Sequence, residues 1–343
     1  MIEIIAVEKA VGLPLAHDIT EIRPGEFKGA AFHRGHILQA EEVEHLRRLG
    51  KNHLYVLRPE AYEMHEDDAA EAIATALCGD GVGWDNPPRE GKITLKARYD
   101  GLFKVDVEAL TRFNEIGDVM CATRHTNSYV QKGQKVGATR AIPLLIAKDR
   151  VKKAIEVCGE SDSVVKVLPI KSANVGLLIV GTEVYEGRIK DRFEPIIRNK
   201  VEAFGGRIMD VVFLPDDKDR IAREALNLVN RGVDILFTTG GMSVDADDVT
   251  RPAIEQAGGK DILYGSAVLP GAMFMTGVLE GVPFLGIPAC GMYAKATVLD
   301  LVYPRILAGE RITRRDIARL GHGGYCLHCK RCQFPDCAFG KSV

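Results

Sequence analysis

The chain has 343 residues, enough for two or three domains, and its 46% hydrophobic and 27% charged residues are ordinary for a globular protein. A formal net charge of −2 argues against a surface that coats nucleic acid, because phosphate binding needs concentrated positive charge. The opening MIEIIAVEKAVG lacks the basic leader of a secretory signal, and no apolar run approaches the ~20 residues of a membrane span. We expect a cytoplasmic protein that binds neither membranes nor nucleic acid.

The first half of the chain is predicted to contain two regions, an α+β region over 1–78 and a mainly β region over 79–171. In the first, AEEVEHLRRLG predicts a helix ending at Gly50, HLYVL a strand over 53–57, and the next stretch a helix over Ala61–Leu77. The loop CGDGVGWDNPPREG, dense in Gly and Pro, opens the second region. Only one helix, at about 149–158, is expected there.

From residue 172 the character of the chain changes. The runs VGLLIVG, RIMDVVFL, VDILFTTGG and VPFLGIP are apolar and rich in β-branched residues, as in strands buried on both faces of a largely parallel sheet. Amphipathic helices are expected between and after them, over Arg198–Phe204, Lys218–Asn230, Thr250–Ala257 and Ala294–Leu307. This alternation predicts an α/β fold class, with a three-layer α/β/α domain and a mainly parallel sheet over 172–309.

Four predicted strand ends in this domain carry polar or glycine-rich sequence. Ligands of open α/β sheets bind beyond the carboxyl ends of the strands, so these ends are expected to share one edge. They are VGTEVYEGRIKDR with Thr182, Glu183 and Asp191, LPDDKD with Asp216 and Asp217, TTGGMSVDADDVT with Thr239 to Asp248, and GIPACG with Pro288 and Cys290.

The stretch TTGGMSVDADDVT has two interpretations. Gly240 and Gly241 allow close approach of backbone to a ligand, Ser243 can donate to an anion, and aspartates beside it can carry Mg²⁺. Alternatively, the stretch is a structural turn whose polar residues cap the next helix. Its position among four polar strand ends favours the ligand site. No P-loop and no Gly-x-Gly-x-x-Gly after a strand accompany it.

Several blocks together resemble the molybdopterin-binding domain of molybdenum-cofactor assembly proteins, and most of all the molybdopterin molybdenumtransferases. The blocks are VGTEVYEGRIKDR, LPDDKDRIAREAL, DILFTTGGMSVDADDVTR, LPGAMFMTGVLEGVPFLGIPACGMYAKAT and PRILAG, in that order over about 172–309. The family pattern Gly-Gly-x-Ser-x-Gly-x-x-Asp is met in register by Gly240, Gly241, Ser243 and Asp248. VEKAVGLPLAHDI and HRGHILQAEEVEHLRRLGKNHLYVL also look like pieces of the transferases' auxiliary domains.

This resemblance implies a ligand and a set of site residues. Molybdopterin or the molybdenum cofactor would bind by its phosphate or pyrophosphate, and Mg²⁺ would accompany it. The implied ligand-binding residues are Thr182, Glu183, Thr239, Gly240, Gly241, Ser243, Pro270, Gly271 and Pro288. Asp248, with Asp191 and Asp217, would carry Mg²⁺ or assist at an adenylylated intermediate. Molybdenum enzymes or cofactor-assembly proteins are the implied partners, and a homo-oligomer is expected.

The chain also departs from the transferase pattern. Asp245 stands where glycine is usual, LPGAM lacks the two lysines that surround Pro270 and Gly271 in transferases, and Cys290 replaces an asparagine. Lost cations weaken the stabilisation of a phosphoryl-transfer transition state. Three hypotheses follow: a cofactor assembly or handling protein that includes a divergent transferase, a non-catalytic binder or redox or metal sensor, and a nucleotide hydrolase of the competence-damage type. Cys290 is expected to be a small buried residue and Asp247 to face solvent.

The segment 310–343 is predicted to be a cysteine-rich metal-binding tail. Cys326, Cys329, Cys332 and Cys337 lie within 12 residues, and a chain without a signal peptide keeps its thiols reduced. Four thiolates suit tetrahedral Zn²⁺ or an iron–sulfur cluster, and the C-x2-C-x2-C run favours the cluster. Residues 311–343 hold seven Lys and Arg against two Asp, a net of 7 − 2 = +5.

Overall fold

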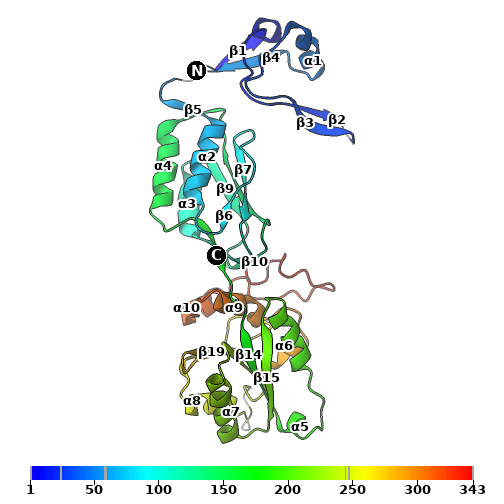
Figure 1. The fold of residues 1–343 in the computed structure, drawn as a ribbon, viewed down its shortest axis with the longest axis vertical. Helices are drawn as coiled ribbons and strands as arrows, with labels where there is room; N and C mark the ends of the chain where they lie inside the picture. Colours follow the sequence, from blue (N-terminus) through cyan, green and yellow to red (C-terminus); the bar gives the residue numbers. More distant parts are fainter. Residues whose placement is uncertain (1, 24, 58–59, 244, 246–247, 342–343) are drawn as a thin grey trace. The chain divides into compact units, whose positions relative to one another are not determined.

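The computed structural model describes residues 2–23, 25–57, 60–243, 245 and 248–341. The chain forms two compact units, drawn in Figure 1. Unit 1 contains residues 1–99, 103–124 and 130–167, and unit 2 contains residues 100–102, 125–129 and 168–343. Within the described residues, no helix is long and apolar enough to cross a membrane.

The N-terminal part of unit 1 is built from two antiparallel strand pairs and a short helix. β1 (Ile2–Ala6) pairs with β4 (His53–Leu57), which is the predicted strand, and β2 (Ile19–Arg23) pairs with β3 (Phe27–Phe32). Two 3-10 helices, η1 (Val7–Ala10) and η2 (Ala40–Glu42), accompany α1 (Val43–Arg48). Leu38, Leu46 and Leu54 are buried in the core of this part.

The rest of unit 1 packs helices against small sheets. The antiparallel sheet has the order β6 (Val82–Gly83), β7 (Lys92–Ala97), β11 (Lys135–Ala141), β9 (Val119–Thr123). The helices are α2 (Glu66–Leu77), α3 (Val107–Glu115) and α4 (Lys148–Gly159). β5 (Glu63–His65) pairs with β12 (Leu145–Ala147). A three-stranded sheet has the order β10 (Ser128–Val130), β8 (Gly101–Val105), β13 (Val165–Pro169), and its residues are divided between unit 1 and unit 2.

Two sequence predictions for this region are wrong in detail. The helix predicted from Ala61 begins at Glu66, because Glu63–His65 pairs as a strand and the His65 ring accepts a hydrogen bond from the Asp67 N–H (3.1 Å) as its N-cap. The region 79–171 contains a second helix, α3, which begins where Asp106 accepts from the Ala109 N–H at 2.9 Å. A single side-chain cap and a nine-residue amphipathic stretch were too short to stand out among strands.

Unit 2 contains the predicted mainly parallel sheet. Its order is β15 (Arg207–Leu214), β14 (Asn174–Val180), β16 (Ile235–Thr239), β19 (Val282–Ile287), β18 (Met275–Leu279), β17 (Lys260–Tyr264). The pairings β15–β14, β14–β16 and β16–β19 are parallel, whereas β18 and β17 add antiparallel strands at one edge. The four apolar runs therefore form the parallel part of the sheet, as predicted.

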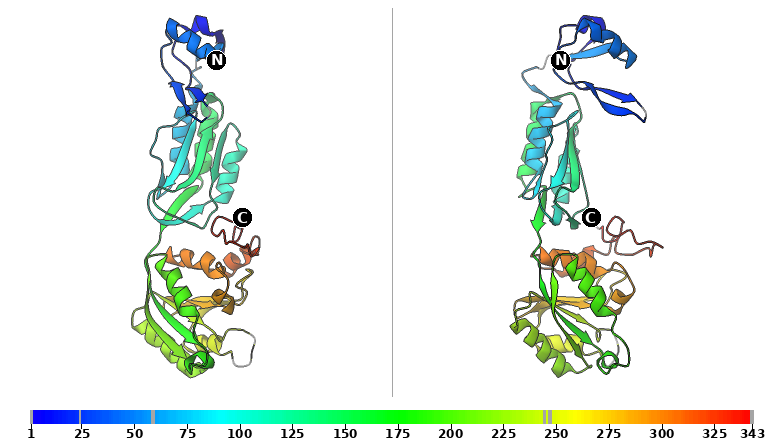
Figure 2. Two further views of the ribbon diagram at one scale, coloured as in Figure 1. Left: turned by 90° about the vertical axis from the view of Figure 1, so that its right-hand side faces the viewer. Right: turned by 45° about the vertical axis from the view of Figure 1, so that its right-hand side comes forward.

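Helices cover both faces of this sheet (Figure 2). Alternate residues of β14 enter two cores, with Leu177 in one and Leu178 in the other. α6 (Phe193–Glu202) and α9 (Val298–Leu307) pack in the first core, and α7 (Lys218–Asn230) and α8 (Thr250–Gln256) pack in the second. The fold is therefore the predicted three-layer α/β/α arrangement.

Helix boundaries in unit 2 follow the caps. α7 has the predicted bounds and α8 differs by one residue, but α6 begins at Phe193 rather than at Arg198, and α9 begins at Val298 rather than at Ala294. α9 starts late because Thr297 and Asp300 form a capping box, and a 3-10 helix, η3 (Ala289–Met292), precedes it. A four-residue helix, α5 (Thr182–Tyr185), follows β14.

The first part of the tail is fixed to the α/β domain by a buried ion-pair network. Arg305 in α9 donates from Nε to Glu310 (2.6 Å) and from its Nη2 to Asp316 (2.7 Å) in α10 (Arg314–Arg319). Ile317, Leu320 and Phe339 are buried in the same core as α6 and α9. The tail is thus packed on the α/β domain. The predicted domain boundaries at 78, 171 and 309 stay a prediction.

Candidate functional site

Three loops of unit 2 enclose a cavity of about 640 Å³ at the carboxyl ends of the parallel strands. The strands β16 and β19 end side by side, because Thr239 pairs with Ile287 in register. The loops that follow them, from Gly240 and from Pro288, therefore start at the same sheet edge, and the loop Leu269–Met273 closes the cavity beside them. We call this cavity the glycine-loop pocket.

Most of the residues predicted from the sequence gather in this pocket. Seven of the twelve predicted ligand-binding and catalytic residues line it, and they come from three segments that are distant in sequence: Gly240, Gly241, Ser243, Asp248, Pro270, Gly271 and Pro288. The parallel register explains this convergence, since the carboxyl ends of adjacent parallel strands meet at one edge.

The two glycines are required by the fold itself. Gly240 and Gly241 have φ of 80° and 57°, in the left-handed region that glycine adopts without strain. A Cβ on Gly240 would lie 1.9 Å from the carbonyl oxygen of Val180, and one on Gly241 would lie 2.5 Å from Oγ1 of Thr250. Thr250 Oγ1 also donates to the Gly240 carbonyl (2.9 Å), which joins the loop to the start of α8. The glycine pair therefore has a structural cause before any ligand is considered.

Asp248 is held at the pocket wall by the backbone of Asp245. The Asp245 N–H donates to Oδ2 of Asp248 (2.9 Å), and the Asp248 N–H donates to the Asp245 carbonyl (3.1 Å). Asp248 is half-buried and lines the pocket, whereas Asp245 is exposed. Tyr264 steadies the same loop by donating from its hydroxyl to the Met242 carbonyl (2.5 Å). Asp247 lies outside the described residues.

The pocket is poor in positive charge. Among the described residues that line it, none is a lysine or an arginine, and its charged or titratable side chains are Asp248, Cys290, Tyr325 and His328. An anionic ligand would therefore depend on backbone N–H groups, on the Ser243 hydroxyl, or on a cation bridged by Asp248. Because LPGAM lacks the two lysines of the transferase pattern, the described lining offers no lysine or arginine to stabilise negative charge on a ligand.

The remaining predicted residues have local roles elsewhere. Asp191 caps α6 by accepting from the N–H groups of Phe193 (3.0 Å) and Glu194 (2.8 Å). Asp217 caps α7 in the same way, accepting from Asp219 and Arg220 (3.0 Å each). Neither lines the glycine-loop pocket. Their assignment to catalysis stays a prediction, beside a capping role that accounts for both carboxylates.

The threonines and Glu183 also lie outside the lining. Thr182 donates to Asp216 from its N–H and from Oγ1, each at 2.9 Å, which joins the loops after β14 and β15. Glu183 lies in the first turn of α5. Thr239 is fully buried at the end of β16, and its hydroxyl has no hydrogen-bond partner among the described residues. A buried hydroxyl of this kind is costly, and it lies directly before the glycine loop.

Cys290 lies at the pocket wall, half-buried, at a strand-to-helix turn. Burial raises the pKa of its thiol, so the sulfur is held in its protonated form. This fits the expectation of a small packed residue better than that of a reactive thiol.

The sequence did not predict the contribution of the tail to the pocket. Tyr325 and His328 line it, although they lie more than 70 residues after the glycine loop in sequence. The tail reaches this position through a parallel β-bridge between Leu269 and Tyr325, in which the Cys326 N–H donates to the Leu269 carbonyl (2.8 Å). No local sequence pattern predicts such a bridge, because a single isolated pairing leaves no hydrophobic periodicity in either segment.

The domain that carries this pocket matches a known family. Residues 176–308 match the family described as "Probable molybdopterin binding domain". This match covers the glycine loop, Pro270, Gly271 and Pro288, but not Tyr325 and His328. Residues 4–58 match a family described as a domain of unknown function. The resemblance of this segment to transferase auxiliary domains stays a prediction.

Curated relatives match only part of the chain. A CinA-like protein of Mycolicibacterium vanbaalenii is 29% identical over 97 residues, which cover 28% of this chain and 23% of that protein. A CinA-like protein of Mycobacterium tuberculosis is 30% identical over 92 residues, covering 27% and 21% respectively. The matched region thus spans less than a quarter of the length of these relatives.

Part of this chain is also similar to solved structures, which cover about two fifths of its length. The molybdopterin biosynthesis enzyme MoaB from Thermus thermophilus is 21% identical, covers 40% of this chain and 98% of its own, and gives a TM-score of 0.36. The tungsten cofactor synthesizing protein MoaB from Pyrococcus furiosus is 17% identical, covers 42% and 100%, and gives 0.35.

Proposed function

We propose that unit 2 binds a molybdopterin-type pterin through its phosphate in the glycine-loop pocket, and that the protein acts in molybdenum-cofactor assembly or handling. The observation that carries this proposal is the convergence of Gly240, Ser243, Asp248, Pro270 and Pro288 on one cavity of about 640 Å³. The volume is in the range of pockets that hold small ligands, ~300–1,000 Å³. The family match over 176–308 supports a pterin as that ligand.

Mg²⁺ fits this pocket as a bridge between protein and ligand. The ion usually takes one or two carboxylates together with phosphate oxygens and water. Asp248 supplies one carboxylate at the pocket wall, fixed there by the Asp245 N–H. A bound Mg²⁺ would offset the repulsion between Asp248 and a ligand phosphate, which no lysine or arginine of the described lining offsets.

The same charge distribution favours binding over transfer chemistry. Phosphoryl-transfer sites stabilise developing negative charge with lysine, arginine and metal ions. The described lining offers no such side-chain cation besides His328 when that ring is protonated. We therefore place the protein among cofactor carriers or handlers, and expect no release of molybdenum cofactor from adenylylated molybdopterin with molybdate and Mg²⁺.

The test is an anaerobic calorimetric titration of the full chain with molybdopterin and with its adenylylated form, each with Mg²⁺ and with a chelator. We expect binding that weakens at least about tenfold without Mg²⁺ and in Asp248→Asn. Asp217→Asn is the matched control, because Asp217 is a carboxylate that follows another parallel strand of the same sheet, β15, and does not line the pocket. Absence of binding by both forms would overturn the proposal.

A nucleotide hydrolase is the second candidate, because the curated relatives are CinA-like proteins. A nucleotide pyrophosphate presents the same anionic group to the glycine loop as an adenylylated pterin. Incubation with a panel of pyrophosphate-containing nucleotides, followed by chromatography of the products, separates the two. Turnover that disappears in Asp248→Asn, together with no pterin binding, would favour the hydrolase.

A further inference from the structure

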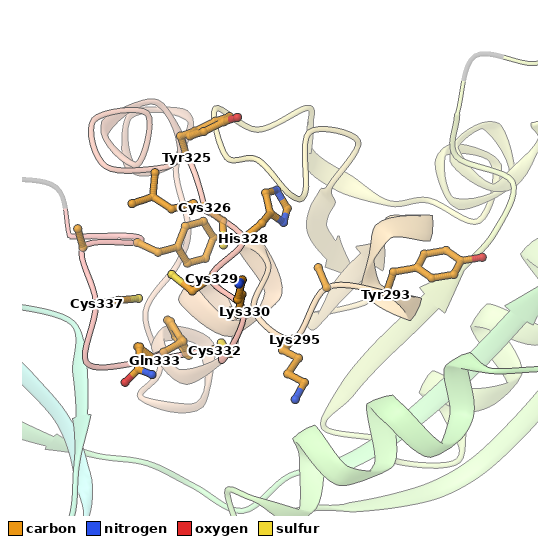
Figure 3. Close-up of a pocket in the computed structure, with 16 residues that line it drawn as sticks. Tyr293, Lys295, Tyr325, Cys326, His328, Cys329, Lys330, Cys332, Gln333 and Cys337 are labelled. Carbon is orange, nitrogen blue, oxygen red and sulfur yellow. The ribbon is translucent and has the colours of Figure 1, made fainter.

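A second cavity, of about 310 Å³, lies between the tail and the segment before α9. All four tail cysteines line it, as do Lys295 and Lys330. Figure 3 shows the side chains of Cys326, Cys329, Cys332 and Cys337 arranged around the same part of this cavity. We call it the tail cavity. The four thiols that the sequence places within 12 residues therefore all line one cavity.

The segment that carries the cysteines is a loop with fixed ends. The Gly340 N–H donates to the Gly323 carbonyl (2.9 Å), which closes the loop at its base. On one side the β-bridge joins Leu269 to Tyr325, and on the other Phe339 is buried in the domain core. Cys326 and Cys337, at the two ends, pack partly against that core, whereas Cys329 and Cys332 are exposed. The loop therefore presents two thiols from the core side and two from the solvent side.

The spacing of the cysteines favours a cluster over a single ion, because the C-x2-C-x2-C run is typical of iron–sulfur ligand loops. Four thiolates on one Zn²⁺, with Zn–S bonds of about 2.3 Å, bring their sulfurs to within about 4 Å of one another. Among the described residues no three Cys, His, Asp or Glu side chains are gathered closely enough to hold a metal ion, so the four thiols do not form a preformed site in this structure. A cluster needs a different arrangement, because each thiolate binds its own iron and the inorganic core keeps the thiolates apart.

We propose that Cys326, Cys329, Cys332 and Cys337 hold a four-iron iron–sulfur cluster in the tail cavity. Each thiol loses its proton as its sulfur forms one bond to iron, so four thiols, two ferrous ions, two ferric ions and four sulfide ions give the cluster and four protons, with no net transfer of electrons. The thiolate-bound cluster is anionic. Lys295 and Lys330 at the cavity, and the net charge of 7 − 2 = +5 over residues 311–343, offset that charge.

The other four cysteines are poor competitors for metal. Burial raises the pKa of Cys78 and of Cys121 to about 12 and that of Cys158 to about 11, so these thiols stay protonated at neutral pH. Burial also raises the pKa of Cys290, which lies in the glycine-loop pocket and not in the tail cavity. They provide matched controls within the same chain.

The experiment is anaerobic reconstitution of the full chain with ferrous iron, ferric iron and sulfide. The products are measured by iron and acid-labile sulfide analysis, visible absorption and Mössbauer spectroscopy. We expect about four irons and four sulfides per chain. Cys326→Ser and Cys332→Ser, one from each side of the cavity, should lose most of the bound iron, and Cys290→Ser and Cys158→Ser should keep it. Circular dichroism of each variant checks that the fold is retained.

Three outcomes would overturn the proposal. The first is a colourless protein that binds one zinc per chain and takes up no iron. The second is a cluster that survives in the variant with all four tail cysteines replaced by serine. The third is a folded wild-type chain that takes up no metal. None of these readouts depends on pterin binding, so the proposed function and the cluster fail or succeed separately.

Discussion

Replacing Gly240 by alanine tests the geometry of the glycine loop directly. The new Cβ would lie 1.9 Å from the Val180 carbonyl oxygen, and a Cβ atom essentially never lies closer than 3.0 Å to such an atom. The two backbone segments must therefore separate by at least 3.0 − 1.9 = 1.1 Å. Both segments continue strands in the centre of the sheet, so neither can move without disturbing the pairing of β14 with β16.

The expected cost has two parts, and a control variant isolates one of them. Alanine in the left-handed region costs about 1–2 kcal/mol, and this applies equally to Gly232→Ala, where φ is 86° and a Cβ would meet nothing within 4 Å. Overpacking against a backbone atom adds about 1–3 kcal/mol at Gly240 alone. The loss of unfolded-state entropy is the same in both variants and cancels in the comparison.

The assay is thermal unfolding by calorimetry, with circular dichroism and tryptophan fluorescence. Unit 2 has 3 + 5 + 176 = 184 residues, and a domain of that size shifts its Tm by about 2–4 °C per kcal/mol. An excess cost of about 2 kcal/mol then lowers the Tm of Gly240→Ala by about 4–8 °C below that of Gly232→Ala. Trp84, the single tryptophan, lies in unit 1 and reports whether that unit is affected. Equal Tm values for the two variants would refute the close approach of the loop to Val180.

Further predictions concern the carboxylates and the tail. Asp217→Ala should lower the stability of unit 2 by about 1 kcal/mol, measured by urea unfolding, because it removes the cap of α7, and it should leave ligand affinity unchanged; a stable variant that no longer binds ligand would assign Asp217 to the site. Burial opposes ionisation of Asp316, but hydrogen bonds from Thr313 and Arg305 outweigh it and lower its pKa to about 2 from 3.8. Because the folded-state pKa is depressed, the Asp316 carboxylate stabilises the fold by about 2 kcal/mol above pH 4, and roughly half of that stabilisation is lost by pH 3. The urea midpoints of wild type and Asp316→Asn should therefore converge as the pH falls. A difference between the two midpoints that stays constant with pH would contradict the assignment. Tyr325 and His328 line both the tail cavity and the glycine-loop pocket, so reconstitution of the cluster should change the affinity of the full chain for molybdopterin in titrations. His328→Ala should reduce that difference in affinity while keeping the iron. Equal affinities with and without the cluster, under conditions where pterin binds, would show that the two cavities are independent.

Much of the pocket was predictable from the sequence because its signals are local. The apolar runs and amphipathic helices after residue 172 predicted the three-layer fold, and the parallel register then brought their polar ends to one edge. Gly240, Ser243 and Asp248 lie in one short stretch directly after a buried strand, so their grouping in the pocket follows from that strand alone. The sequence LPGAM also showed directly that no lysines surround Pro270 and Gly271.

The structure decided what depends on contacts between distant residues. Asp191 and Asp217 look like site residues in sequence, yet each bonds the N–H groups two or three positions ahead, and only the backbone conformation shows this. His328 joins the pocket through an isolated bridge between Leu269 and Tyr325, which leaves no pattern in either segment. Periodicity and spacing determine which elements form and which residues follow them, because both are short-range properties of the chain. The residues that each side chain contacts in the folded protein are determined by packing between distant segments, and only the three-dimensional structure shows that packing.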